Sequence, residues 1–539
     1  MPKKQGQDTT QFGLFATPLE AMIASDNEVR VIAAFVDGLD LDELGFVQVH
    51  SQGRSRYSSD VLLKIYLYGY LNGIRSSRKL EKACRVNIEL MWLTGNLQPA
   101  YHTIADFRKD HPDALKQVFR TFTLLLKDWA LLGLDTIAID GTKIRGQNAM
   151  KRNFNKKKIK RQLDRIDAQI EEAIQEWEQA DEQTQQEKRP AIDELLRKLD
   201  DRREGYERLD QFLDESGETQ ISLTDPDTRA LPLHRNIVEV GFNVQQAVDD
   251  KHNLIVHQEV TNQGDINALG DLAVDTCNEL SLSLDDEVTV LADKGYHNAA
   301  ELDYCQQNNI ETLVAERKQS SGKKEVGFRK EDFVYQPDED VYICPAGEKL
   351  TTNGQLYKKP SGSRRGHTAY RFHRYTTSSR VCHACALKDK CLSTSALQQR
   401  HARGIERNEF AEALDRNKES LQARPELYKR RQAIVEHPFG TIKRSWGYTY
   451  TLLKGLEKVG GEWSLIATCY NLRRSMSIVG VPLLLEWLNS GKSIKNRLKS
   501  MILMLWSWVE REMSYQYQEP LCRLVRRRQK VVNLVGVQG

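Results

Sequence analysis

Apolar residues recur at every third or fourth position early in the chain and again near its end. Residues 58–74 begin with serines that suit a helix N-terminus and then carry apolar residues at helical spacing. Shorter segments of the same kind follow at 75–85 and 102–111. The pattern predicts a bundle of short helices over residues 15–130, and helices once more over residues 405–480.

A second helical region, residues 157–213, has the spacing of two packed helices. Its apolar residues keep intervals of three or four on both sides of Pro190: Ile159, Leu163, Ile166, Ile170, Ala173 and Trp177 before it, and Leu195, Leu199, Tyr206, Leu209 and Leu213 after it. A proline interrupts the helical hydrogen-bond ladder, so we expect an antiparallel pair of helices that folds back at Pro190.

Short apolar runs of strand type lie between these helical regions. They occur at 134–140, at 236–263 as a hairpin, at 287–293 and at 311–317, with helices expected at 268–281 and 299–308. Residues 319–400 read as short strands rich in glycine, serine and tyrosine. Strands that alternate with helices predict an α/β fold whose core is interrupted twice by inserted units.

Composition adds little to this picture, but the distribution of charge adds more. The chain has 539 residues, 40% of them apolar and 28% charged, with a formal net charge of +3 that demands no nucleic-acid partner. Basic residues cluster at 108–111, 151–161 and 523–530, where they form solvated faces or phosphate-binding patches. The early helices, with Arg75, Arg78, Lys79, Arg108 and Lys109 expected on their surface, suit either a helix-turn-helix-like DNA reader or an ordinary bundle.

Neither end of the chain carries a membrane or export signal. No long apolar run follows the first lysines, and the apolar segment 501–509 is about half the length of a membrane helix. We therefore expect a soluble, intracellular protein with no membrane partner.

Two aspartates share a pattern at the ends of predicted strands. Asp140 in "AIDGTKIRG" and Asp293 in "LADKGYHN" each follow an apolar run and precede a glycine within two residues. The pattern is typical of a turn that ends a strand, but it is also typical of ligand-binding residues at strand ends. Two carboxylates on neighbouring strands would repel unless a cation lay between them, and Mg²⁺ prefers such oxygen ligands.

A third acid, Glu436 in "IVEHPFGTIKR", lies among basic residues that suit a phosphate backbone. Lys443 follows seven residues later, on the same helical face if the helix runs unbroken through Pro438. Either a helix begins near Pro438 or a longer helix is kinked there. A surface salt bridge is the alternative role for Glu436.

The runs "IDGTK", "ADKGYHN" and "VEHPFGTIKR" together resemble the acidic triad of bacterial insertion-sequence transposases of the Asp-Asp-Glu (DDE) type, and "TDPDTR" and "GFNVQQAVD" add to the likeness. The resemblance implies a ribonuclease H-like catalytic domain with Asp140, Asp293 and Glu436 as catalytic residues. These three would hold two Mg²⁺ ions, for which Mn²⁺ may stand in.

The same resemblance implies a tyrosine, arginine, glutamate and lysine signature along one helix. Tyr428, Arg431, Glu436 and Lys443 fit it, although Arg431 lies one residue too far from Glu436 and Arg430 is an alternative. Lys443 is expected to contact phosphates at the transposon end. The other residues expected near bound DNA are Lys143, Arg145 and Lys294.

Four of nine cysteines are clustered: Cys344, Cys382, Cys385 and Cys391. They supply the ligands of a structural zinc site, or they are free intracellular thiols. The scattered cysteines Cys84, Cys277, Cys305, Cys469 and Cys522 are predicted to lie in the core.

The resemblance thus predicts a bacterial, cytoplasmic, nucleoid-associated DNA transposase. It would cleave double-stranded DNA at transposon ends and join the 3′ hydroxyl to target DNA as a homodimer. A metal-dependent nuclease without strand transfer and a non-catalytic DNA-binding protein are the alternatives. The expected domains are an N-terminal helical DNA-binding domain (1–130), a catalytic domain in three parts (131–150, 218–318 and 401–480), a helical-hairpin insertion (151–217), a β-rich insertion (319–400) and a basic amphipathic tail (481–539).

Overall fold

The computed structural model describes residues 18–46, 57–147, 150–179, 181–232, 238–283, 286–316, 327–359 and 370–490. The chain divides into two compact units, one made of Met1–Ala114 with Leu472–Gly539 and the other of Leu115–Asn471. The predicted amphipathic tail beyond residue 490, together with Cys522, lies outside the described residues.

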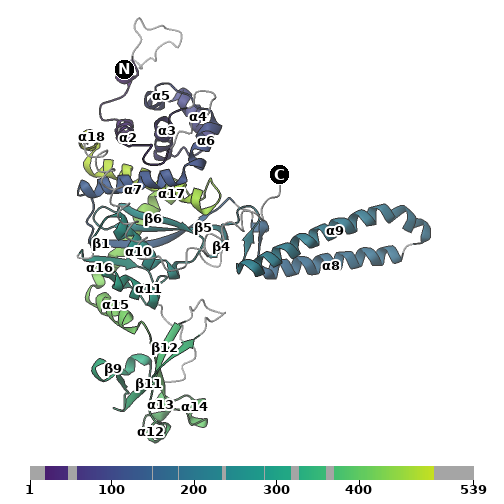
Figure 1. Cartoon of the computed structure of the whole chain (residues 1–539), viewed down its shortest axis with the longest axis vertical. Coiled ribbons are helices and arrows are strands. Elements are labelled where there is room, and N and C mark those ends of the chain that lie inside the picture. Colours follow the sequence, from purple (N-terminus) through teal and green to yellow (C-terminus); the bar gives the residue numbers. More distant parts are fainter. Residues whose placement is uncertain are drawn as a thin grey trace, which may run out of the picture. The chain divides into compact units, whose positions relative to one another are not determined.

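The first unit is helical, as the apolar spacing predicts. Its helices are α1 (Leu19–Met22), α2 (Glu28–Asp37), α3 (Ser59–Leu71), α4 (Ser77–Val86), α5 (Ile88–Thr94), α6 (Tyr101–Asp110) and α18 (Val481–Asn489). Every residue of α3 from Val61 to Leu71 is buried, so α3 is the central helix, and α2 and α5 pack on it. In Figure 1 this unit is drawn in purple, with α18 in yellow.

Two of the arginines expected on the surface of this unit are buried instead. Arg108 donates from Nη1 to the Tyr70 hydroxyl at 2.6 Å and lies over the ring of Tyr66. Arg75 is also buried, and its carbonyl accepts from Arg108 at 3.4 Å. The expectation that both arginines lie on the surface is wrong: Arg108 ties α6 to the central helix α3, and Arg75 is buried beside it.

The second unit is built on a mixed six-stranded sheet. Its strands are β1 (Thr136–Arg145), β4 (Arg229–Pro232), β5 (Val238–Asp249), β6 (Ile255–Thr261), β7 (Val288–Ala292) and β8 (Ile310–Val314). They run in the order β4-β5-β1-β7-β8, and β6 also pairs with β5. The strands β1, β7 and β8 are parallel, whereas β5 is antiparallel to β1, β4 and β6. The predicted α/β core and its hairpin at 236–263 are confirmed.

The helices that follow the strands also match their predicted places. They are α10 (Leu269–Glu279), after the short turn η2 (Asp265–Asn267), and α11 (Ala299–Gln307). The strand β1, however, is longer than predicted, because it runs ten residues and pairs with β5 from Ile137 to Arg145. Asp140 therefore lies in the middle of a strand, and only Asp293 comes directly after one.

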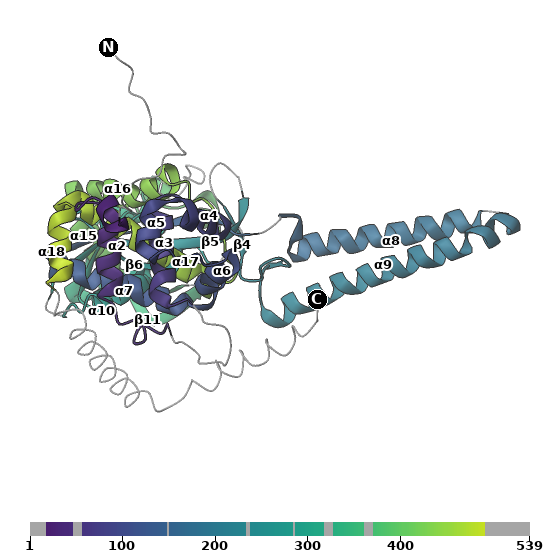
Figure 2. The ribbon, with the colours of Figure 1, turned by 90° about the horizontal axis from the view of Figure 1, so that it is seen from above.

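The inserted helical pair consists of α8 (Lys156–Glu178) and α9 (Glu182–Ser216), which lie side by side (Figures 1 and 2). Phe154, Ile159 and Leu213 form a small core at their base. The chain does not fold back at Pro190, which lies inside α9. Pro190 is in the ninth position of α9, so the reversal falls before Glu182 and the predicted place of the break is wrong.

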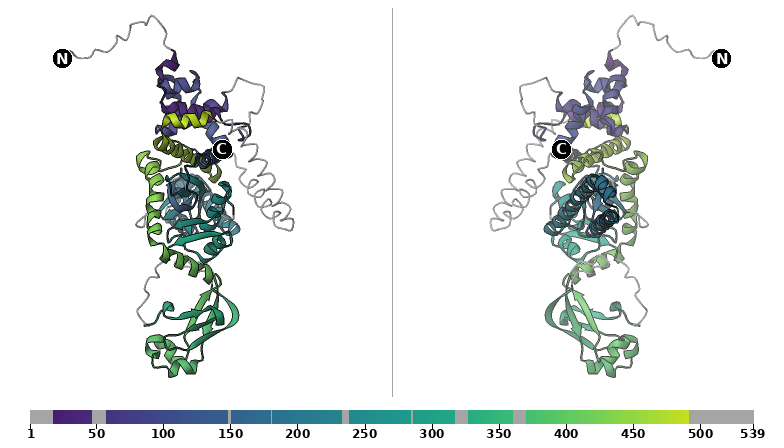
Figure 3. Two further views of the ribbon diagram at one scale, coloured as in Figure 1. Left: turned by 90° about the vertical axis from the view of Figure 1, so that its left-hand side faces the viewer. Right: turned by 90° about the vertical axis from the view of Figure 1, so that its right-hand side faces the viewer.

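The β-rich insertion is a five-stranded antiparallel sheet (drawn in green in Figure 3). Its strands are β9 (Val334–Gln336), β10 (Val341–Ile343), β11 (Lys349–Lys359), β12 (Tyr370–Thr376) and β13 (Gly404–Asn408), and three short helices, α12 (Ser379–Ala384), α13 (Lys388–Cys391) and α14 (Thr394–Gln398), join β12 to β13. Since β13 pairs with β12, the sheet extends beyond the expected limit at residue 400, and residues 404–408 are not helical as predicted.

Helices return after β13. They are α15 (Ala411–Ala423), α16 (Pro425–Phe439), the π-helical turn η5 (Gly440–Ser445) and α17 (Leu456–Val479). Ile434 and Val435 of α16 pack on Ala138, Val248, Leu291 and Leu313 of the sheet. Among the described helices, none is long and apolar enough to cross a membrane.

Candidate active site

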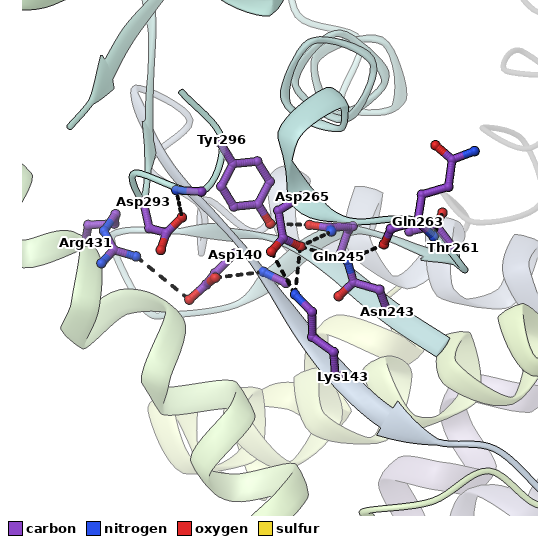
Figure 4. Close-up of polar contacts among 12 residues, drawn as sticks. Asp140, Lys143, Asn243, Gln245, Thr261, Gln263, Asp265, Asp293, Tyr296 and Arg431 are labelled. Atoms are coloured by element: carbon purple, nitrogen blue, oxygen red, sulfur yellow. Dashed lines mark hydrogen bonds and ion pairs between the residues drawn. The ribbon is translucent and has the colours of Figure 1, made fainter. Parts of the chain in front are cut away.

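Strand register brings Asp140 and Asp293 together. In the parallel pair β1–β7, Ile139 is opposite Ala292, so the residue after each comes beside the other. Successive residues of a strand point to opposite faces, and Asp140 therefore shares a face with Ala138, against which α16 packs. Figure 4 shows Asp293 and Arg431 on one side of Asp140.

The electrostatics of Asp140 reflect this crowding. The pKa of Asp140 is raised to about 6, chiefly by burial and in smaller part by the carboxylates of Asp293 and Asp265, against the opposing effects of the Gly141 N–H and Arg431. The Gly141 N–H donates to Asp140 Oδ1 at 2.8 Å, and Arg431 Nη1 lies 3.8 Å from Oδ2. A carboxyl in this setting gains from a cation placed beside it.

Asp293 is fixed by the turn that follows it. The Gly295 N–H donates to Asp293 Oδ1 at 2.5 Å, and the Tyr296 N–H donates to the Asp293 carbonyl at 3.1 Å. A methyl group at Gly295 would lie 2.6 Å from Asp293 Oδ1, so only glycine allows the turn to close this tightly. The need for this tight turn explains why a glycine stands at position 295, two residues after Asp293.

The third predicted acid, Glu436, does not lie with the two aspartates. The helix α16 runs unbroken through Pro438 into η5, which settles the open choice in favour of the longer helix. Arg431 of that helix points at Asp140, and Glu436, five residues on, lies about 140° further round the helix. Its side chain is exposed and accepts from Gln432 Nε2 at 2.7 Å.

The remaining residues of the predicted signature also have defined places. Tyr428 packs against the sheet side of α16, and the Arg431 guanidinium lies over its ring at 5.9 Å. Arg430 pairs with Asp250 at 2.5 Å. Lys443 donates to Thr142 Oγ1 at 2.9 Å and to the Lys143 carbonyl at 3.3 Å, and burial lowers the pKa of its ammonium.

The other basic residues expected near DNA divide into two kinds. Arg145 and Lys294 are exposed, and Arg145 lies over the ring of Tyr450 at 5.9 Å. Lys143 instead turns to the opposite face of the sheet from Asp140, where its ammonium lies 2.7 Å from Asp265 Oδ2.

Sequence reasoning missed a polar network on that opposite face, which we call the rear network: Lys143, Asn243, Gln245, Asp265 and Tyr296. Asp265 accepts from Lys143, from Asn243 Nδ2 at 2.7 Å and from Gln245 Nε2 at 2.9 Å. The fully buried Tyr296 donates its hydroxyl hydrogen to Gln245 Oε1. Burial alone would raise the pKa of Asp265, but Lys143 and the two amides hold it below its usual value. Figure 4 shows these contacts on the other side of Asp140 from Arg431.

One buried polar side chain on the Asp140 face has no protein partner. Gln246 is directly opposite Asp140 in the β1–β5 pair, and residues so paired share a face. It is fully buried, and neither its Nε2 nor its Oε1 meets a hydrogen-bond partner in the described chain. Because buried polar groups are normally satisfied, an amide with no partner among the described residues, beside the Asp140 carboxylate, fits a hydrated cation there.

The described residues nevertheless contain no group of three His, Cys, Asp or Glu side chains already placed to hold a metal ion. Asp140 and Asp293 are adjacent carboxylates, and Glu436, exposed and bonded to Gln432, is not placed with them.

The clustered cysteines Cys344, Cys382, Cys385 and Cys391 line one cavity of the β-rich insertion, but they too are not already placed as a group that could hold a metal ion. Burial raises the pKa of the Cys391 thiol, Arg403 opposes that effect, and the other three thiols add to it. The Leu387 N–H donates to Cys385 Sγ at 3.4 Å. Of the scattered cysteines, Cys84, Cys305 and Cys469 are buried and Cys277 is half-buried.

Two segments of the chain match known protein families. Residues 17–110 match the transposase domain family DUF772, and residues 239–472, which contain Asp293 and Glu436, match the transposase DDE domain family. No curated protein matches the chain significantly. Among solved structures, a piggyBac transposase in a synaptic complex with hairpin DNA aligns at 10% identity and a TM-score of 0.29, over 95% of this chain and 87% of that one. So low a TM-score carries no structural argument, and the assignment rests on the two family matches.

Proposed function

Since this chain belongs to the DDE-type transposases by these two segments, we propose that it binds the ends of a transposon, hydrolyses the DNA there and joins the freed 3′ hydroxyl to target DNA. The observation that carries the proposal is the β1–β7 register, which sets Asp140 beside Asp293 on the face covered by α16. The strand order, with three parallel strands and β5 antiparallel beside them, supports a ribonuclease H-like core.

Asp140 and Asp293 would hold two divalent ions, Mg²⁺ or Mn²⁺, with Glu436 completing one shell. When bound, such ions activate water and neutralise charge at the phosphorus under attack. The chain's own part is to keep the two carboxylates adjacent, with Asp140 largely removed from water, and to offer the open amide of Gln246 to a water molecule. Glu436 reaches this place only if it leaves Gln432 and turns toward the sheet.

The DNA would lie along the exposed basic residues near these acids. Lys294 directly follows Asp293, and Arg145 ends the strand that carries Asp140. Arg430, Arg431, Tyr428 and Lys443 would take part from α16 and η5, with Arg431 and Lys443 first released from their contacts to β1. Two ends must be joined in concert, so a homodimer on DNA is part of the proposal, as is a DNA-binding role for residues 1–130.

A zinc ion in the β-rich insertion belongs to the same proposal. Its ligands would be the four thiolates of Cys344, Cys382, Cys385 and Cys391, which leave no position open for catalysis. Metal analysis of the purified full-length protein is expected to give one zinc per chain. Cys382→Ser should lose that zinc, whereas Cys277→Ser, which changes a thiol outside the cavity, should keep it. Zinc-free wild type would leave the thiols as free cysteines.

The function is tested with the full-length protein, DNA that carries the terminal repeats, and Mg²⁺. Cleavage followed by joining to a second DNA is expected, and Asp293→Asn should abolish both steps. Cleavage without joining would indicate a nuclease, and binding without cleavage would indicate a DNA-binding protein. If Asp293→Asn cleaved as well as the wild type, the metal site would be assigned to the wrong residues.

A further inference from the structure

The rear network touches the strand that carries Asp140 and the turn that follows Asp293. Its Lys143 is three residues after Asp140 on β1, and its Tyr296 is three residues after Asp293. Asp265 joins the two sides: it binds Lys143 directly, and it binds Gln245, which in turn accepts from Tyr296. A continuous chain of hydrogen bonds therefore runs behind the sheet from one aspartate's strand to the other's turn.

Close backbone approach shows that this connection is tight. A methyl group at Gly141 would lie 2.7 Å from Asp265 Oδ1 and 2.8 Å from Gln245 Nε2. A methyl group at Gly295 would lie 3.8 Å from Asp265 Cβ. Asp265 thus lies directly behind the residue that follows Asp140 and within van der Waals reach of the turn that holds Asp293.

A second link ties the Asp265 turn to the Asp293 side. Asn298 Nδ2, two residues after Tyr296, donates to the Ile266 carbonyl at 3.2 Å and to Asn267 Oδ1 at 2.8 Å. The turn η2 is therefore held to the 293–298 segment at two points. Movement of η2 would shift both aspartates' backbones.

The buried Lys143–Asp265 ion pair is not the side-chain choice that stability alone would favour at this place. Burying an ion pair costs desolvation that its attraction scarcely recovers, and apolar side chains of the same size often stabilise a fold as well. Lys143 and Asp265 have side chains only 19% and 24% exposed. The ion pair and the amides of Asn243 and Gln245 instead fix the orientation of the groups that they join, because a hydrogen bond is directional.

We propose that Asp265 is a positioning residue of the active site, which through Lys143, Gln245 and Tyr296 sets the separation of Asp140 and Asp293 and so tunes the affinity for the divalent ion. This inference rests on the proposed function. Groups that orient metal ligands from behind typically change metal affinity by about 10–100-fold when they are lost.

The test measures Mn²⁺ binding to the full-length protein by the electron paramagnetic resonance signal of free Mn²⁺, beside the melting temperature. Asp265→Asn keeps the size of the side chain and removes the charge that holds Lys143. Tyr296→Phe removes only the hydroxyl that reaches Gln245 and keeps the ring. Both variants are expected to bind Mn²⁺ about tenfold more weakly than the wild type. Asp303→Asn, which changes a half-buried aspartate whose carboxylate accepts from Gln307 of the same helix α11, is the matched control and should bind as the wild type does.

The outcomes separate this inference from the proposed function. If the wild type binds Mn²⁺ and Asp293→Asn does not, while Asp265→Asn and Tyr296→Phe bind as tightly as the wild type, the positioning role is refuted and the metal site stands. Lower melting temperatures with unchanged Mn²⁺ affinity would likewise reduce the network to a structural role. A wild type that neither binds Mn²⁺ nor cleaves DNA would overturn both proposals.

Discussion

Gly141 offers a sharp test of how tightly the sheet is built behind Asp140. Alanine is allowed there by the extended backbone of β1, so the substitution changes only the space behind the strand. That space is already filled, because the new methyl group would lie 2.7 Å from Asp265 Oδ1, 2.8 Å from Gln245 Nε2 and 3.0 Å from Asn243 Oδ1. The shortest of these contacts is about 0.7 Å inside the 3.4 Å at which ordinary van der Waals contact begins.

The size of the effect follows from two opposing contributions. Forcing an extra carbon into a packed site costs about 1–3 kcal/mol, because side chains must leave their positions. Replacing glycine by alanine returns about 0.4–1 kcal/mol by restricting the unfolded chain. Taking the middle of both ranges, Gly141→Ala is expected to lower the free energy of unfolding by about 1 kcal/mol. Because Asp265 Oδ1 is the atom nearest to the new methyl group, the hydrogen bonds of Asp265 are expected to lengthen or break.

Urea unfolding followed by circular dichroism measures this change as a lower midpoint for the transition of the sheet. Gly205→Ala is the control, since Gly205 lies in α9 with nothing within 4 Å of an added methyl group. That control should stabilise its helix by about 0.5–1 kcal/mol. If Gly141→Ala were as stable as the wild type and kept full cleavage activity, the close packing behind β1 would be wrong.

Three further predictions concern the Asp140 face. Glu436→Gln should lose metal-dependent DNA cleavage by about 100-fold or more while folding normally, since its side chain is exposed; unchanged cleavage would mean that another acid completes the site. Because a proton competes with the metal at Asp140, whose pKa is about 6, the Mg²⁺ concentration for half-maximal cleavage should rise as the pH falls below about 6, and a pH-independent value would contradict this. The pKa of Asp140 is higher in the folded than in the unfolded chain, so without added metal the folded state loses stability as the pH rises from about 4 to 6. The melting temperature measured without metal should fall over this range, and added Mg²⁺ should raise it again.

The sequence predicted the strands and the paired aspartates because both depend on local pattern. The parallel pairing of β1 with β7 then follows from an α/β arrangement, and it brings Asp140 to Asp293. The length of β1 could not be predicted from the sequence, because Asp140 followed by Gly141 is typical of a turn. The strand stays extended through Gly141 because nine of its residues pair with β5. The prediction that the chain reverses at Pro190 was wrong because it relied on a local signal alone. A proline in the early part of a long helix is tolerated when packing against α8 outweighs its local cost.

Asp265 could not be found by the same means. It stands in the loop "TNQGDIN", where nothing local distinguishes it from a turn residue. One signal was present, however: Asn243, Gln245 and Gln246 lie in the middle of a largely apolar strand, and buried amides require partners. Finding that partner needs the β5–β6 hairpin, which brings residues about twenty positions apart into contact.

The two faces of the sheet differ in how firmly they hold their acids. Asp140 and Asp293 are fixed by backbone N–H groups and, through β1 and the turn at Gly295, by the rear network. Glu436 is exposed on α16, and the helix there contains Pro438 and passes directly into the π-helical turn η5. Proline and π-helical turns weaken the regular hydrogen-bond ladder, so this part of the helix can turn at less cost than a regular one.

That difference has a consequence for the proposed reaction. Asp140 now has Arg431 beside it, which supplies part of the positive charge that a metal ion would bring. If Glu436 completes the metal site, α16 must rotate by enough to move Arg431 away from Asp140 and bring Glu436 in, because the two lie about 140° apart on one helix. The released arginine would then be free for a DNA phosphate, so metal binding and the availability of Arg431 to DNA would be coupled through one helix. The proposal thus combines a fixed pair of aspartates with a third acid on a helix that has to rotate to reach them.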